Sequence, residues 1–229
     1  MTPIVNGNVH TFAQMGLYDG LFLMGDAETV SYWDHITGEC VYGPLQGHRL
    51  EVGQLHHLTA AQTLAAYPEA QIAISKMPLW QRLMGRIQRF GAMRKNGVLP
   101  PRFRGSMGEA DERLPRMEMG LGIWTNKTQR YYPMHTLKQA GEALWDQMDG
   151  RDLLIYLDPA THTPTAVYTP KQPFHWHDDH LQFTDGSKIA DSLLVMSDGA
   201  TQRLERPQQL FTRWYGFAYT FPGCEIYAK

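Results

Sequence analysis

The chain has 229 residues, of which 43% are hydrophobic and 19% are charged, and its formal net charge at pH 7 is −2. This composition is typical of a folded protein with one large domain or two small ones, and it excludes a disordered chain or a coiled coil. The near balance of charges gives no general attraction to nucleic acid or to an anionic membrane, so no nucleic-acid partner is favoured.

The first part of the chain has the pattern of short strands separated by turns. Apolar and aromatic runs at Leu21–Met24 and Val30–Trp33 predict two strands, and Asp19-Gly20 and Thr37-Gly38 predict turns beside them. Trp33 is expected in the core, because its large ring favours burial and its indole N–H can donate to a buried acceptor.

A short helix and a further strand are expected next. Thr59 is a suitable N-cap, the residues that follow favour a helix as far as Ala66, and Pro68 would end it. The stretch from Ala70 to Ser75 then predicts a strand.

Residues 76–118 differ in character from the rest of the chain. Eight basic residues lie from Lys76 to Arg104, and apolar residues at helical spacing predict an amphipathic helix over residues 79–95. This stretch could bind an acidic partner, RNA or anionic lipid. The negative net charge instead favours a solvated helix face that is neutralised within the fold.

The second half begins with a predicted hairpin and helix. Gly122–Thr125 and Gln129–Tyr132 predict strands joined by a tight turn. Pro133 would lie in the first turn of a helix that runs to about Met148 and ends at Asp149-Gly150.

Strands and turns then alternate to the C-terminal helix. Asp152–Leu157 and Thr165–Tyr168 predict paired strands around a turn at Asp158, and Leu181–Phe183 and Ser192–Met196 predict two more. The aromatic residues near the C-terminus could line a ligand pocket, but core packing of a last helix is favoured.

Two segments of the chain end in the same way. Leu58–Ile72 and Phe211–Ile226 each contain a helix-like run that closes with an aromatic residue, a proline, three residues and an isoleucine. Pro68 and Pro222 are 154 residues apart (222 − 68 = 154). A match of this kind indicates a duplicated unit.

These patterns predict an α+β fold that is rich in β structure, with mostly antiparallel sheet and two related strand-turn-helix-strand units. We expect a first, shortened unit over residues 1–75 and a second unit over residues 119–229. Residues 76–118 would form the basic helix and a Pro-rich linker between them, and the units would pack as one globular body.

The stretch from Gly20 to Leu45 resembles the bacterial family catalogued as domain of unknown function 3179. The matching positions in this stretch are Trp33, Thr37, Gly38, Glu39, Gly43, Pro44 and Leu45. Arg113–Pro115, Tyr131–Pro133 and Phe221-Pro222 are similar to later parts of the same family. The resemblance covers most of the chain and supports the duplication, but it implies no reaction, because the family has no assigned activity.

One departure from the family concerns the first unit. Many relatives carry a Cys-Pro-x-Cys-Gly segment there, before the part at which this chain begins. The resemblance therefore implies that the first unit lacks its opening strand and helix, and that any metal or redox chemistry of those cysteines is absent here. An unpaired sheet edge in the shortened unit would favour self-association.

The chain shows no targeting or membrane signal. Its N-terminus lacks the basic and apolar regions of a signal peptide, and no apolar run approaches the ~20 residues of a membrane helix. We expect a cytoplasmic protein by default, and an exported one if Met1 is not the natural start.

Only two cysteines occur, Cys40 and Cys224, so the chain has no Cys-x-x-Cys site. They could form one long-range disulfide or remain free, and Cys40 is expected to be a structural thiol. The chain also lacks a Gly-x-Ser-x-Gly elbow, a phosphate loop and a dinucleotide fingerprint. No residue is therefore assigned a catalytic role.

The densest group of candidate ligands is the sequence FHWHDDH, from Phe174 to His180. On a strand, His175 and His177 point to one face, and His180 with a neighbouring aspartate could complete a transition-metal site. The alternative is a polar, solvated hairpin end. His48, His56 and His57 form a looser group that could act as bases or ligands, or be ordinary partly exposed side chains.

Two classes of function follow from the sequence. The favoured one is a non-catalytic binding or structural protein. The alternative is a metal-binding protein or metal-dependent enzyme that uses His175, His177 and His180.

Overall fold

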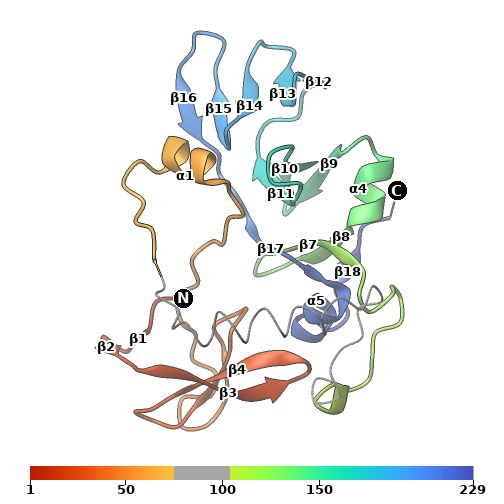
Figure 1. Ribbon diagram of the computed structural model, residues 1–229. Coiled ribbons are helices and arrows are strands. Elements are labelled where there is room, and N and C mark those ends of the chain that lie inside the picture. Colours follow the sequence, from red (N-terminus) through yellow and green to blue (C-terminus); the bar gives the residue numbers. More distant parts are fainter. Residues whose placement is uncertain (75–103, 229) are drawn as a thin grey trace, which may run out of the picture.

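The computed structural model describes residues 1–74, here called the first half, and residues 104–228, here called the second half (Figure 1). The predicted amphipathic helix over residues 79–95 lies outside the described residues. Where the chain is described, no helix is long and apolar enough to cross a membrane.

The first half is built around an antiparallel sheet in the order β3-β4-β5-β6. Its elements are β1 (Ile4–Val5), β2 (Asn8–Val9), β3 (Phe12–Tyr18), β4 (Leu21–Asp26), β5 (Tyr32–Asp34), β6 (Cys40–Tyr42) and α1 (Ala60–Ala66). Asp19 and Gly20 both have positive φ, 50° and 71°, as the turn of a two-residue hairpin requires, and they join β3 to β4. The two strands predicted here are confirmed.

Trp33 is the centre of the first-half core, as predicted. It is fully buried and packs with Val5, Cys40 and Leu50. Its indole N–H donates to Asp26 Oδ2 at 2.8 Å, which satisfies both polar groups inside the core.

The second half contains three sheets. Its elements are β7 (Met119–Trp124), β8 (Gln129–Pro133), α4 (Met134–Gln139), β9 (Ala143–Met148), β10 (Arg151–Leu157), β11 (Pro164–Tyr168), β12 (Phe174–His177), β13 (His180–Phe183), β14 (Lys188–Ala190), β15 (Leu193–Val195), β16 (Thr201–Arg203), β17 (Gln208–Arg213), α5 (Trp214–Thr220) and β18 (Glu225–Ile226). The sheet orders are β17-β7-β8-β18, β11-β10-β9 and β12-β13-β14-β15-β16. Strand β18 pairs with β8 in parallel, and all other pairs among the described strands are antiparallel. The β-rich, mostly antiparallel architecture is thus confirmed.

Trp214 and Phe217 of the C-terminal aromatic residues pack in the core, as favoured from the sequence, whereas Tyr219 and Phe221 are only partly buried. Tyr131, Trp214 and Phe217 are fully buried, and the rings of Tyr131 and Trp214 meet edge to face with centroids 5.1 Å apart. Gly122 of β7 has to be glycine, because a Cβ there would lie 2.1 Å from the Phe217 ring. This close approach seats α5 on the sheet.

Helix α1 has the predicted bounds and cap. The Thr59 hydroxyl accepts the N–H of Gln62, and the Gln62 side chain accepts the N–H of Thr59, which together form a capping box. The helix ends at Tyr67, directly before Pro68.

The strand predicted from Ala70 to Ser75 is wrong over residues 70–74, which form no strand, and Ser75 lies outside the described residues. No strand of the described residues pairs with this stretch, and a strand without a partner is not stable in water. Ile72 and Ile74 are consequently 77% and 83% exposed.

The helix predicted from Pro133 to Met148 is also wrong in its second part. Helix α4 ends at Gln139, and Gly141 and Glu142 then take positive φ, which reverses the chain. Strand β9 follows because its residues pair with β10 along its whole length. The Asp149-Gly150 turn joins these two strands instead of ending a helix.

The remaining strand predictions in the second half are confirmed by the pairs β7–β8, β10–β11 and the strands β13 and β15. Cys40 and Cys224 are both buried and free, so the alternative of a disulfide does not hold.

The two halves are tied together by side chains that cross between them. Gln54 donates to the carbonyl of Arg206, and Gln208 donates to the carbonyl of Val52 at 3.1 Å. Gln62 of α1 donates to Asp158 Oδ2 at 2.9 Å, in a buried position. Helix α1 also lies beside β16 (Figure 1), where Arg203 donates to the carbonyl of Ala66 at 2.8 Å.

His56 lies in the first-half segment that makes these crossings. Its ring nitrogens lie 3.1 Å from Gln54 Oε1 and 3.2 Å from the Tyr67 hydroxyl. Burial of the ring, together with the positive charge of Arg206, lowers the pKa of His56 to about 4. The imidazole is therefore neutral at physiological pH.

The neutral His56 predicts a pH dependence of stability. As the pH falls from about 6.5 towards 4, the unfolded chain binds a proton at His56 that the folded chain does not, so the folded state loses about 2 kcal/mol. His56→Gln should remove this part of the slope in urea unfolding at pH 7.5, 5.5 and 4.5. His175→Gln, on the exposed β12–β13 hairpin, is the control and should keep the wild-type slope. An equal slope in His56→Gln and wild type would contradict the assignment.

Candidate functional site

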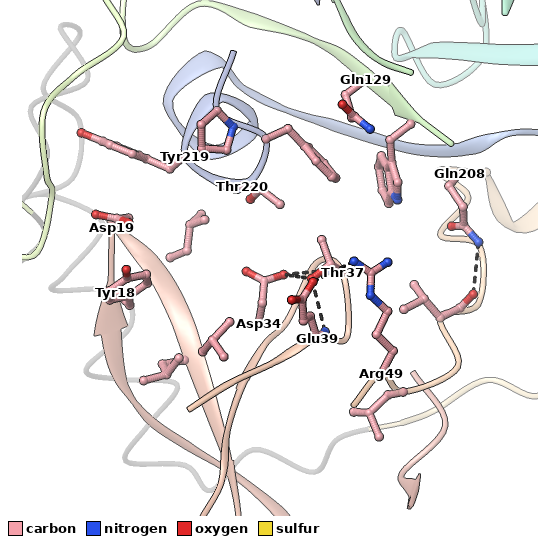
Figure 2. Close-up of a pocket in the computed structure, with 18 of the residues that line it drawn as sticks. Tyr18, Asp19, Asp34, Thr37, Glu39, Arg49, Gln129, Gln208, Tyr219 and Thr220 are labelled. Atoms are coloured by element: carbon pink, nitrogen blue, oxygen red, sulfur yellow. Dashed lines mark hydrogen bonds and ion pairs between the residues drawn. The ribbon is translucent and has the colours of Figure 1, made fainter. Parts of the chain in front are cut away.

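A cleft of about 680 Å³ opens between the first-half sheet and the end of α5 with the β7–β8 turn (Figure 2). Its first-half lining consists of Tyr18, Asp19, Leu21, Phe22, Leu23, Asp34, Thr37, Glu39, Val41, Arg49, Leu50 and Val52. Its second-half lining consists of Trp124, Thr125, Asn126, Gln129, Gln208, Tyr219, Thr220, Phe221 and Pro222. The cleft thus needs both halves.

Asp34 lies on the first-half side of the cleft, at the end of β5. Its Oδ1 accepts the N–H of Ile36 at 2.9 Å and both the N–H and the hydroxyl of Thr37, at 2.6 and 2.9 Å. This is the arrangement by which an aspartate closes a turn on its own backbone. Its Oδ2 accepts no hydrogen bond from the described residues and is available to a ligand.

An ion pair lies beside Asp34. Arg49 Nη2 and Glu39 Oε2 are 2.8 Å apart, and their side chains are 62% and 41% exposed. An exposed pair of this kind contributes little to stability, so either partner can turn to a ligand at small cost.

The opposite wall contains three aromatic side chains, and the name aromatic wall is used for them below. The rings of Trp124, at the end of β7, and Phe221, after α5, have centroids 5.4 Å apart. The Tyr219 hydroxyl donates to the carbonyl of Gly108 at 3.0 Å, which fixes a third ring at the other end of the wall. Figure 2 shows Tyr219 and Gln129 across the cleft from Asp34.

The charges of the lining are predominantly acidic. Three carboxylates, Asp19, Asp34 and Glu39, stand against one guanidinium, Arg49. Acidic groups facing an aromatic wall attract a cation, because the face of an aromatic ring is also negative.

The predicted metal ligands lie elsewhere, on the β12–β13 hairpin. His177 is the direct cross-strand partner of His180, and His175 lies two residues before His177, so all three side chains are on one face. The rings of His175 and His177 have centroids 6.5 Å apart, and both are exposed. Whether they hold a metal stays a prediction.

The looser histidine group has no shared partner. His48 Nδ1 lies 3.0 Å from the carbonyl of Leu45, and the His57 ring meets Phe211 edge to face at 6.0 Å. His56 binds Gln54 and Tyr67 instead, as described above.

Both thiols are in positions that suppress reactivity. Burial raises the pKa of Cys40, and it raises the pKa of Cys224 to about 11. A thiol with a raised pKa is a poor nucleophile, which agrees with the predicted structural role of Cys40.

From the sequence, the C-terminal aromatic residues were a pocket lining only as the less favoured alternative, and one signal for the opposite wall was present. The sequence Asp-x-x-Thr at Asp34–Thr37 indicates an aspartate that caps its own turn. The aromatic wall comes from residues about 90 to 190 positions later, which no local pattern connects to Asp34.

A family model described as a protein of unknown function, DUF3179, matches residues 2–175, more than half of the chain. The chain belongs to the DUF3179 family. The DUF3179 match includes Asp34, Arg49 and Trp124 and ends in β12, before Tyr219 and Phe221. Neither the curated proteins nor the solved structures gave a match.

Proposed function

We propose that this DUF3179 protein is a non-catalytic binding protein that takes a small organic cation in the cleft beside Asp34. The observation that carries the proposal is the Asp34 Oδ2 atom, which accepts no described hydrogen bond and belongs to the same cleft lining as the rings of Trp124 and Phe221. Concave sites in which polar groups orient a ligand against aromatic rings are typical of small-molecule binding. The suppressed thiols support a role without covalent chemistry.

Asp34→Asn tests this function, because the amide oxygen can still accept the N–H groups of Ile36 and Thr37 while the charge is lost. We expect phenethylamine, an aromatic amine, to bind in an NMR titration and to bind about 10-fold more weakly to the variant, as loss of a charge-assisted hydrogen bond predicts. Its neutral analogue 2-phenylethanol should bind weakly to both proteins.

A matched control is Asp185→Asn. Asp185 caps the β13–β14 turn by accepting the N–H and hydroxyl of Ser187 at 2.8 and 2.6 Å, and it does not line the cleft. This control should bind phenethylamine as the wild type does. Equal affinity of wild type and Asp34→Asn, or no binding at all, would contradict the proposal.

The second candidate function is metal binding at His175, His177 and His180. The β12–β13 register supports it, because it places the three imidazoles on one face of a hairpin. Under this hypothesis, the His175→Ala/His177→Ala double variant loses one bound equivalent of Zn²⁺ in calorimetry. If the double variant binds as many Zn²⁺ ions per chain as the wild type, metal binding at these histidines is excluded.

We also propose that the chain contains two related units, over residues 1–75 and 119–229. Two hairpins support this proposal. Asp19-Gly20 and Asp149-Gly150 are turns with positive φ at both residues, and a buried aspartate lies at the end of the strand after the first turn (Asp26) or directly after the strand that follows the second (Asp158). Each aspartate accepts the N–H of a threonine three residues later, Thr29 or Thr161.

The helix ends and the crossing glutamines also support duplication. Helices α1 and α5 have seven residues each, and their C-caps Tyr67 and Phe221 have φ of −137° and −127° with the same ψ of 75°. Gln54 and Gln208 make reciprocal bonds, each to a carbonyl two residues before the other. An experimental structure in which only one of these bonds forms would weaken the proposal.

Self-association is proposed for the exposed stretch that contains Ile72 and Ile74. In the second unit the corresponding residue, Ile226, lies on β18 and pairs with β8, whereas Ile72 has no strand beside it among the described residues. We expect the wild type to dimerise in light scattering and Ile72→Lys/Ile74→Lys to reduce the dimer, with Leu64→Lys on exposed α1 as the control. A wild-type monomer at all concentrations would contradict this.

A further inference from the structure

Three side chains with metal-binding atoms meet away from the cleft, at the edge of the first-half core. His10 follows β2, Asp26 ends β4, and Glu28 lies in the turn after β4. One ligand atom from each lies within 4.8 Å of the other two. His10 Nδ1 is 3.4 Å from Asp26 Oδ1 and 3.8 Å from Glu28 Oε2.

The His10 ring is the unusual member of this cluster. Its side chain is 9% exposed, and its buried Nδ1 has no well-aligned hydrogen bond with any described group, although it lies 3.4 Å from Asp26 Oδ1. A buried polar atom without a partner costs about 1–3 kcal/mol. The atom faces two carboxylates, which points to a cation between the three groups.

We propose that His10, Asp26 and Glu28 bind a divalent transition-metal ion such as Zn²⁺. A tetrahedral zinc site with bond lengths of about 2.0–2.2 Å places its ligand atoms about 3.3–3.6 Å apart, close to the two distances from His10. A neutral imidazole and two carboxylates also match the charge of the ion. The Glu28 side chain is 38% exposed, so a water molecule can reach the fourth position.

The ligands are held in place by groups that do not depend on a metal. Asp26 accepts the N–H of Thr29 at 2.6 Å and the indole N–H of Trp33 at 2.8 Å. The two oxygens of Glu28 accept the N–H of Thr11 at 3.0 and 2.9 Å, which fixes the carboxylate next to His10. Outer hydrogen bonds of this kind orient metal ligands before the ion arrives.

Zinc titration of the chelator-treated protein by calorimetry tests the site. We expect the wild type to bind Zn²⁺, and His10→Ala and Glu28→Gln each to lose one equivalent or to bind it at least about 10-fold more weakly. Co²⁺ should give a visible absorption spectrum in the wild type that both variants lack. Glu28→Gln is the safer variant for folding, because the side chain is partly exposed and the amide oxygen can still accept the Thr11 N–H.

Two controls separate this site from the rest of the chain. His162→Ala changes an exposed histidine beside Asp158, the aspartate that corresponds to Asp26, and should keep the affinity. The His175→Ala/His177→Ala variant should still bind the one equivalent of Zn²⁺ that the His10→Ala variant no longer binds. Phenethylamine binding in the cleft should not change in His10→Ala, so the two proposals can fail separately.

Several results would overturn the proposal. These are the absence of stoichiometric zinc, equal zinc affinity in wild type and His10→Ala, or binding of Ca²⁺ with no binding of Zn²⁺. The other overturning result is a His10 ring that NMR shows to be doubly protonated and unaffected by added Zn²⁺, because His10 would then pair with Asp26 directly.

Discussion

A carboxylate that is removed from water has to be surrounded by hydrogen-bond donors, and the described fold is arranged around two such groups, Asp26 and Asp158. Asp26 receives the indole of Trp33 and thereby positions the side chain at the centre of the first-half core. Asp158 receives the amide of Gln62 and thereby holds α1 against the second half. Each aspartate also closes its own turn by accepting the N–H of a threonine three residues later. The same short motif therefore supports the first-half core at Asp26 and the contact between the halves at Asp158.

The sequence predicted elements well where the deciding interactions are local. Helix α1 is specified by the cap at Thr59 and the proline at Pro68, and the β3–β4 hairpin by the Asp19-Gly20 turn. The errors arose where a partner distant in the sequence decides the structure. Residues 143–148 form β9 because β10 pairs with them. Residues 70–74 form no strand because no described strand pairs with them.

The candidate sites were even harder to predict from the sequence than the strands, because their residues come from distant parts of the chain. The histidines at positions 175, 177 and 180 form a recognisable cluster because they lie within six residues of the sequence, and the strand register places them on one face. The cleft combines Asp34 with Trp124 and Phe221, whose proximity depends on how the halves meet. No pattern in the sequence singles out His10, since neither its burial nor its distance to Asp26 can be read from the chain.

The reciprocal bonds of Gln54 and Gln208 have a consequence for the rate of folding. These bonds join residues 152 and 156 positions apart, whereas the hairpin turns join neighbours. Hairpins form in about 1–10 μs. A contact across a long loop forms more slowly, because closing the loop costs conformational entropy before the contact contributes any stabilising energy. We therefore expect the cleft, which lies where the halves meet, to be among the last parts of the molecule to form during folding.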